Sequence, residues 1–327
     1  MDRLPAKHDA CQKGADQQVR ALLSDSCDWC PRACGANRRA GERGVCGAAD
    51  ELRIARAALH HWEEPPISGS FGSGTVFYSF CPLRCVYCQN HRIALGSSGA
   101  NVSFDRLVQI FLEQQDRGAL NLNMVTPTHY APVIAAALRQ ARDQGLSLPV
   151  VWNTAGYETA EAVKALRGVA DVFLTDFKYA SAATAAAYSH APDYREVALA
   201  ALDQMVAQAG QARFDDFRGQ PRMVKGVLVR HLLLPGHVEE SKQVMELLWE
   251  RYGNKVLYSV MNQYTPVLDP QDPAALRHPE LLTRPTSQEY EQLLDFVDDL
   301  GLEDYFWQDG EAARESFIPA FDLEGVR

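Results

Sequence analysis

The sequence predicts an α/β protein: an open, partial (β/α)6 TIM-like barrel, with a Cys-rich metal-binding module before it and a C-terminal extension after it. Three observations support this prediction. From residue 74 onward, runs of β-branched and aromatic residues alternate with stretches of helical periodicity, the pattern of a parallel sheet covered by helices. Six such units are too few for a closed eight-stranded barrel. Between residues 27 and 70, cysteines and turn-forming residues replace long apolar runs.

Each predicted strand is a short apolar run rich in residues that favour strands. The first reads Thr-Val-Phe-Tyr-Ser-Phe. The six predicted strands are residues 75–80, 120–125, 150–152, 172–174, 227–234 and 256–261. Active sites of such barrels lie at the carboxyl ends of the strands, so the residues that follow each run are candidates for function.

The segments between these strands carry helical signals. In residues 104–117, Leu107, Ile110 and Phe111 share one face. Ala-rich patches at residues 135–137 and 182–187 suit helices, because Ala has the highest helix propensity. The predicted helices of the barrel are residues 104–117, 131–143, 160–166, 196–208 and 238–252.

The predicted division of the chain has three parts. Residues 1–70 form a leader and the Cys-rich module, residues 71–265 form the barrel, and residues 266–327 form an extension that packs on the barrel. The extension contains a predicted helix at 287–300 and a predicted strand at 305–307.

Composition narrows the class of protein. Of 327 residues, 46% are hydrophobic, enough for a sizeable core, and 23% are charged, which does not indicate disorder. A net charge of −10 argues against nonspecific nucleic-acid binding, and nucleic acid is not an expected partner.

The sequence has no apolar run long enough to span a membrane and no secretory signal, so a cytoplasmic location without membrane association is expected. Thiols stay reduced in that compartment, so clustered cysteines indicate metal or redox chemistry.

Three cysteines follow the first strand: Cys81, Cys85 and Cys88. Three thiolates on one short loop can hold three irons of a cubane cluster, which leaves the fourth iron open for a substrate. The alternative is a zinc knuckle that takes His91 as its fourth ligand.

This Cys-x3-Cys-x2-Cys spacing, with Tyr87 just before the last cysteine, resembles the signature of the radical S-adenosylmethionine (SAM) superfamily. By strand order the resemblance covers about residues 74–265. It implies a [4Fe–4S] cluster on Cys81, Cys85 and Cys88, with SAM bound to the open iron. The reduced cluster would cleave SAM, and the resulting 5′-deoxyadenosyl radical would abstract a hydrogen atom. The resemblance also implies that the backbone near Tyr87 meets the adenine, and that a flavodoxin or ferredoxin supplies electrons.

The second strand end departs from the superfamily pattern. The superfamily usually has Gly-Gly-Glu-Pro there, whose backbone receives the methionine amino group. Here Pro127 matches, Thr126 stands in place of the Glu, and Thr128 follows. The hydroxyl and carbonyl groups of these residues can still accept hydrogen bonds from an ammonium group. Alternatively, Thr128 only caps a helix.

The later strand ends resemble those of glycyl-radical-enzyme activases. Asn153 and Thr154 stand where the activases have Asp-Thr-Asn-Gly, and Asp176 and Lys178 match Asp-Leu-Lys. The alternative for the last two is an exposed ion pair. His231 takes the place of a Tyr in an Arg-Tyr-x3-Pro-Gly motif. The resemblance therefore implies cofactor contacts for Tyr87, Thr126, Pro127, Thr128, Asn153, Thr154, Asp176, Lys178, His231 and, after the sixth strand, Asn262.

Further motifs resemble a branch described as similar to the pyruvate formate-lyase activating enzyme. They fall at residues 63–69, 72–75, 88–90, 126–130, 261–264, 310–313 and 316–319. The branch names no substrate, and the favoured use of the radical is hydrogen abstraction from a protein or peptide, as in glycyl-radical-enzyme activation. Two alternatives remain open: radical modification of a small metabolite, and a non-catalytic metal-binding or redox-relay protein.

A second cysteine group lies near the N-terminus: Cys27, Cys30, Cys34 and Cys46. Four thiolates can close a tetrahedral zinc site or bind a second, auxiliary iron–sulfur cluster, and the sequence does not decide between the two. Four arginines of this segment are expected to be counter-charges for thiolates and solvated surface: Arg32, Arg38, Arg39 and Arg43.

Overall fold

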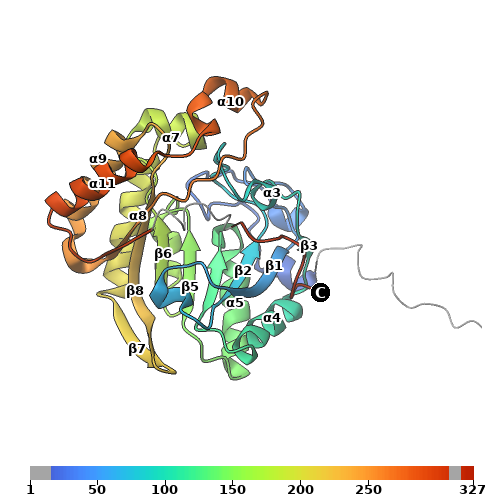
Figure 1. Ribbon diagram of the computed structural model, residues 1–327. Helices are drawn as coiled ribbons and strands as arrows, with labels where there is room; N and C mark the ends of the chain where they lie inside the picture. The colour runs from blue at the N-terminus through green and yellow to red at the C-terminus, as the bar shows by residue number, and fades with distance from the viewer. Residues whose placement is uncertain (1–15, 309–317) are drawn as a thin grey trace, which may run out of the picture.

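The computed structural model describes residues 16–308 and 318–327. In this part of the chain, ten strands form one sheet in the order β3-β1-β2-β4-β5-β6-β8-β9-β10, and β7 pairs with β8. The larger helices lie on the outer side of the sheet (Figure 1). The predicted α/β class with a largely parallel sheet is therefore confirmed.

The centre of the sheet is parallel. Its strands are β2 (Ser73–Tyr78), β4 (Leu122–Val125), β5 (Val150–Thr154), β6 (Val172–Asp176), β8 (Gln220–Leu232), β9 (Leu257–Met261) and β10 (Tyr305–Trp307). The first six correspond to the six predicted strands. The last was predicted as part of the C-terminal extension, and it joins the sheet beside β9.

The helices follow the predicted periodicity. In α4, Ser103 accepts a hydrogen bond from the backbone N–H of Arg106, and Leu107, Ile110 and Phe111 are fully buried. The helices of eight or more residues are α4 (Phe104–Asp116), α5 (Ala131–Asp143), α7 (Ala182–Ser189), α8 (Tyr194–Ala209), α9 (Val238–Tyr252) and α11 (Ser287–Asp299). Within residues 16–308 and 318–327, no helix combines the length and apolar character needed to cross a membrane.

Shorter helices connect these elements. The α-helical ones are α1 (Gln17–Leu22), α2 (Pro65–Ser68), α3 (His91–Ala94), α6 (Ala160–Ala165) and α10 (Pro273–Arg277). The 3-10 turns are η1 (Arg38–Ala40), η2 (Thr128–Tyr130), η3 (Gly253–Lys255) and η4 (Pro279–Leu282).

Three strands were not predicted: β1 (Arg53–His60), β3 (Ala100–Asn101) and β7 (Arg213–Phe217). β1 runs antiparallel to β2, and a register irregularity between Ile54 and Arg56 breaks the two-residue alternation that a strand signal needs. β7 carries two Asp residues and is largely exposed, and its hairpin with β8 projects from the sheet (Figure 1). Because β1 belongs to the central sheet, that sheet crosses the predicted boundary at residue 70.

The Cys-rich segment is bound to the barrel through a buried arginine. Arg38 is 1% exposed, and its Nε donates to the carbonyl of Ala49 over 2.8 Å. Its other bonds reach the barrel, where it donates to the carbonyl of His129 and lies over the ring of Tyr130, 5.2 Å from the centroid. The expectation that Arg38 belongs to a solvated surface is thus wrong, because its Nε and Nη1 donate to buried carbonyl oxygens. Burial raises the pKa of Cys27 and Cys46, but the Arg38 charge acts to lower it, as expected of a counter-charge for thiolates.

We predict that Arg38→Ala lowers the free energy of unfolding by about 1.5–3 kcal/mol, because two buried carbonyls lose a charged donor. Chemical denaturation followed by circular dichroism measures the change. Arg43→Ala is the matched control: that side chain is 64% exposed and pairs with Glu51, so the expected loss is about 0–1 kcal/mol. Equal losses in the two variants would contradict the role given to Arg38.

Candidate functional site

The loop after β2 folds its three cysteines toward one side. Phe80 and Arg84 adopt left-handed backbone angles, with φ of 75° and 52°, which turn the chain sharply on either side of Cys81. The N–H of Cys88 then donates to the carbonyl of Cys85 over 3.2 Å. Local turns, rather than strand or helix, therefore set the directions of these three side chains.

All three cysteines line one cavity of about 220 Å³ at the carboxyl ends of the parallel strands. The wall also includes side chains from the ends of β4, β5 and β6, as expected for a parallel barrel. Six residues with predicted cofactor contacts lie on this wall: Tyr87, Thr126, Asn153, Thr154, Asp176 and Lys178. The fold thus brings these residues together with the cysteine loop.

Four residues with predicted cofactor contacts do not line the cavity. The hydroxyl of Thr128 donates to Glu158 over 2.8 Å, and Nδ1 of His231 lies 2.8 Å from the carbonyl of Phe177. Pro127 precedes η2, and Asn262 uses its backbone N–H to bind Gln308. Their contacts with a cofactor stay predictions. The motif at 310–313 and the first two residues of that at 316–319 lie outside the described residues, and Pro319 lines the cavity.

The ends of β5 and β6 approach closely at Gly156. A Cβ at this position would lie 2.2 Å from the carbonyl oxygen of Asp176, and φ is 77°, so the site requires glycine. Beside it, Nζ of Lys178 lies 2.6 Å from the Asp176 carboxylate. Burial lowers the pKa of Lys178, but Asp176 together with the neighbouring Tyr87, Cys85 and Tyr194 outweighs burial and holds that pKa well above its usual value. The cavity wall therefore presents a fixed ion pair, which is only partly exposed.

Thr126 holds a strained backbone conformation at the end of β4. Its φ is 55°, a region that a β-branched residue rarely adopts and that costs about 1–3 kcal/mol. The N–H of Thr126 donates to the carbonyl of Asn153 over 2.9 Å, which ties it to β5. Thr126 therefore holds a strained backbone conformation on the cavity wall, and its contact with a cofactor stays a prediction.

Burial disfavours the thiolate form of two of the three cysteines. Burial, followed by the neighbouring Cys85, raises the pKa of Cys81 to about 11, and burial likewise raises the pKa of Cys88. Such thiols are stable as thiolates only beside positive charge, which iron provides. Among the residues described, no three Cys, His, Asp or Glu side chains converge on a point that suits a single metal ion. A cubane cluster takes one thiolate per iron and does not require such convergence.

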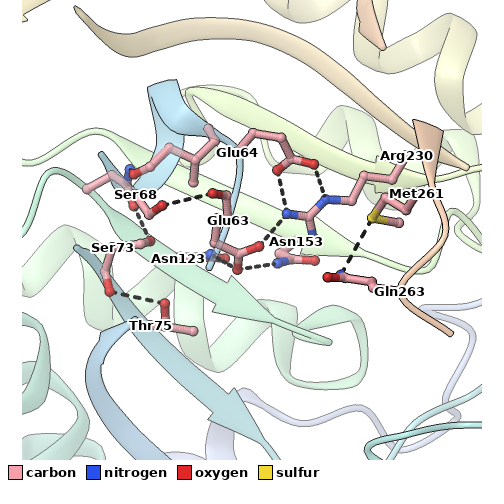
Figure 2. A network of polar contacts seen from close by, with 12 residues as sticks. Glu63, Glu64, Ser68, Ser73, Thr75, Asn123, Asn153, Arg230, Met261 and Gln263 are labelled. Carbon is pink, nitrogen blue, oxygen red and sulfur yellow. Dashed lines mark hydrogen bonds and ion pairs between the residues drawn. The ribbon is translucent and has the colours of Figure 1, made fainter. Parts of the chain in front are cut away.

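Sequence reasoning missed a buried charged network on the cavity wall (Figure 2). Arg230 binds Glu64 through two hydrogen bonds of 2.8 and 2.5 Å, and it also binds Glu63. Glu63 accepts further hydrogen bonds from Asn123 over 2.8 Å and Asn153 over 3.4 Å. The only signal in the sequence was the two adjacent Glu residues that begin the motif at 63–69. Their partner, Arg230 on β8, lies over 160 residues away in the sequence.

The N-terminal cysteines also lie close together. Cys27, Cys30 and Cys46 are buried, and the sulfurs of Cys34 and Cys46 would lie 3.2 and 3.6 Å from a Cβ placed on Gly44. Burial raises the pKa of Cys30 to about 12 and also raises those of Cys27 and Cys46. For Cys34, burial is outweighed by hydrogen bonds from backbone N–H groups, and its pKa is lowered. The described cysteines are free thiols, and a metal at this group is not shown.

Comparison with known proteins agrees with this geometry. Residues 75–248 match the family model described as the radical SAM superfamily. The chain therefore belongs to the radical SAM superfamily, which implies an enzyme with a [4Fe–4S] cluster that cleaves SAM reductively.

Two similar proteins extend the comparison. An uncharacterized protein of Methanocaldococcus jannaschii, MJ0674, is 27% identical over 304 residues, which span 88% of this chain and 78% of that protein. A radical SAM methyltransferase from Sphaerobacter thermophilus superposes with a TM-score of 0.48 and 13% identity. That superposition covers 72% of this chain and 66% of the methyltransferase, just under two thirds of its length.

We predict that Arg230→Met lowers the free energy of unfolding by about 3–5 kcal/mol at neutral pH, because Glu63 and Glu64 lose their buried counter-charge. Denaturation across a pH series measures the effect. Burial raises the pKa of Glu64 and Arg230 outweighs it, so the wild-type pKa is depressed. In the wild type, the pairing of Glu64 with Arg230 therefore stabilises the fold fully at pH values above the pKa that Glu64 has in the unfolded chain. This stabilisation is lost as the pH falls through the lower pKa that Glu64 has in the folded protein.

The deficit of Arg230→Met should consequently shrink at low pH, where the Glu64 carboxyl group becomes neutral. Arg251→Met is the control. It removes an ion pair with Asp203 whose side chains are 46% and 43% exposed, and the expected loss is about 0–1 kcal/mol. A constant deficit at all pH values would contradict an electrostatic origin.

Proposed function

We propose that this enzyme uses SAM-derived radical chemistry to abstract a hydrogen atom from a protein or peptide, as glycyl-radical-enzyme activases do. The observation that carries the proposal is the single cavity shared by Cys81, Cys85 and Cys88 and by the ends of β4, β5 and β6. When bound there, the cluster and SAM would supply a 5′-deoxyadenosyl radical. A flavodoxin or ferredoxin is the proposed source of the electron.

The residues of the chain have distinct proposed roles. The three cysteines hold the cluster, one iron each, and leave one iron for the cofactor. Asp176 is suited to accept hydrogen bonds from ribose hydroxyls, and Lys178 to meet a carboxylate. Because both side chains are fixed by their mutual ion pair, they offer these groups without reordering.

Support for the activase-like branch comes from the motifs on the cavity wall. Glu63 belongs to the motif at 63–69, Gln89 and Asn90 to the motif at 88–90, and Gln263 to the motif at 261–264, and all four side chains line the cavity. Motifs scattered along the chain thus meet in one place, which is the expected result if they serve one reaction.

A second candidate function is radical modification of a small polar metabolite. The observation in its favour is the Glu63–Arg230 pair, which places fixed charges on the cavity wall. The two candidates differ in where the substrate radical resides. Detection of a stable radical on a partner protein after incubation would favour the first, whereas 5′-deoxyadenosine formation driven by a small molecule would favour the second.

We predict that Cys81→Ala, Cys85→Ala and Cys88→Ala each abolish the catalytic cluster and SAM cleavage, because each thiolate holds one iron. Anaerobic reconstitution followed by iron analysis and assay of 5′-deoxyadenosine and methionine tests this. Cys11→Ala is the control, since Cys11 lies outside both cysteine groups, and it should cleave SAM like the wild type. Undiminished cleavage in all three ligand variants would overturn the proposed function.

We also propose that Cys27, Cys30, Cys34 and Cys46 bind zinc or an auxiliary cluster. The prediction is that the triple Cys81, Cys85, Cys88→Ala variant still carries metal: either near-stoichiometric zinc, or iron with sulfide. Elemental analysis of anaerobically purified protein decides between them. Further replacement of the four N-terminal cysteines by Ala should remove that metal and expose the segment to protease. Absence of both metals from the triple variant would contradict the site.

A further inference from the structure

A serine hydroxyl lies against one of the cluster-loop cysteines. Ser189, the last residue of α7, is fully buried, and its Oγ donates to Sγ of Cys85 over 2.9 Å. Among the side-chain hydrogen bonds of the described residues, this is the one that reaches a sulfur of Cys81, Cys85 or Cys88. Cys85 therefore differs from Cys81 and Cys88 in having a side-chain donor, whereas the sulfurs of those two accept from backbone N–H groups of the loop.

Ser189 is held in this position by contacts from two other segments. The N–H of Val86 donates to the carbonyl of Tyr188 over 2.8 Å, which joins the cysteine loop to the end of α7. Arg32 donates to the carbonyl of Ser189 over 2.9 Å and to that of Pro82 over 3.0 Å. The loop and the helix end are thus bound to each other and to the Cys-rich segment.

Two buried tyrosines extend the hydrogen bonding from Ser189 through their hydroxyl groups. The hydroxyl of Tyr179 lies 2.6 Å from Oγ of Ser189, and the hydroxyl of Tyr87 lies 2.8 Å from that of Tyr179. Distances alone leave the donor in each pair open. The proton count settles it, because each hydroxyl has one proton to donate.

Ser189 gives its proton to Cys85, so it must accept from Tyr179. Tyr179 has then used its own proton and must accept from Tyr87. The result is a directed chain from Tyr87 through Tyr179 and Ser189 to Cys85. It begins and ends on the cysteine loop, since Tyr87 lies between Cys85 and Cys88 in the sequence.

We propose that this hydroxyl chain raises the reduction potential of the cluster and fixes the position of the Cys85 sulfur. Reduction adds negative charge to the cluster, and a hydrogen bond to a ligand sulfur stabilises that charge. Each upstream hydroxyl polarises the next, so the full chain is a better donor than Ser189 alone. The inference rests on Cys85 as a cluster ligand and is independent of the proposed substrate.

The test is an EPR-monitored redox titration of the reconstituted holoenzyme without SAM. Ser189→Ala should shift the midpoint potential to more negative values by the largest amount. Tyr179→Phe should shift it less, because Ser189 still donates, and Tyr87→Phe least. Ser189→Thr keeps a hydroxyl and should restore most of the wild-type potential.

Tyr194→Phe is the matched control. Tyr194 is a buried tyrosine whose ring packs against Tyr179 at 5.2 Å between centroids, but its hydroxyl donates to the carbonyl of Ala155 and takes no part in the chain. The midpoint potential of the cluster in Tyr194→Phe should equal that of the wild type. A shift there as large as in Tyr179→Phe would attribute the effect to packing and overturn the inference.

Two further outcomes are decisive. An intact cluster whose potential is the same in Ser189→Ala and wild type would overturn this inference and leave the proposed function standing. A wild-type protein that forms no cluster on Cys81, Cys85 and Cys88 would instead contradict the proposed function. If Ser189→Ala does not retain iron, the midpoint potentials of the other variants decide. The negative shift should be larger in Tyr179→Phe than in Tyr87→Phe, and Ser189→Thr should stay close to the wild type. Any other order of the shifts contradicts the directed chain.

Discussion

The parallel pairing of the central strands is the constraint on which the site depends. Hydrogen bonding in register places the carboxyl ends of neighbouring strands side by side. Asn153 on β5 thus pairs with Val125 on β4 and Leu174 on β6, and Asp176 pairs with Arg230 on β8. Groups from residues far apart in sequence therefore surround one cavity, although none of them is near the cysteine loop along the chain.

Once the strands are paired, the cavity must accommodate polar groups in a poorly solvated space. The structure does this by pairing them. Glu63 and Glu64 share Arg230, and Asp176 meets Lys178. Unpaired buried charges would carry a large desolvation free energy, and pairing offsets part of it. The ion pairs therefore allow charged side chains to line the cavity and hold them in fixed positions.

The N-terminal segment is part of this arrangement and not a separate appendage. Arg38 reaches the carbonyl of His129 just beyond β4, and Arg32 reaches the cysteine loop and the end of α7. β1 then continues the segment into the central sheet. Any metal bound by the N-terminal cysteines would therefore order residues that contact the catalytic loop directly.

The sequence by itself determined the strand–helix alternation, because each central strand and helix has its own apolar periodicity, and it singled out Cys81, Cys85 and Cys88 from their spacing. It did not reveal β1 or β7, whose Ala, Arg and Asp residues lack strand propensity and which form only by pairing with β2 and β8. The tertiary structure alone decided that Glu63 meets Arg230 and that Ser189 meets Cys85, at separations of 167 and 104 residues. The physical reason is that these contacts come from strand register and helix docking, which depend on packing between elements and leave no periodic trace within either one.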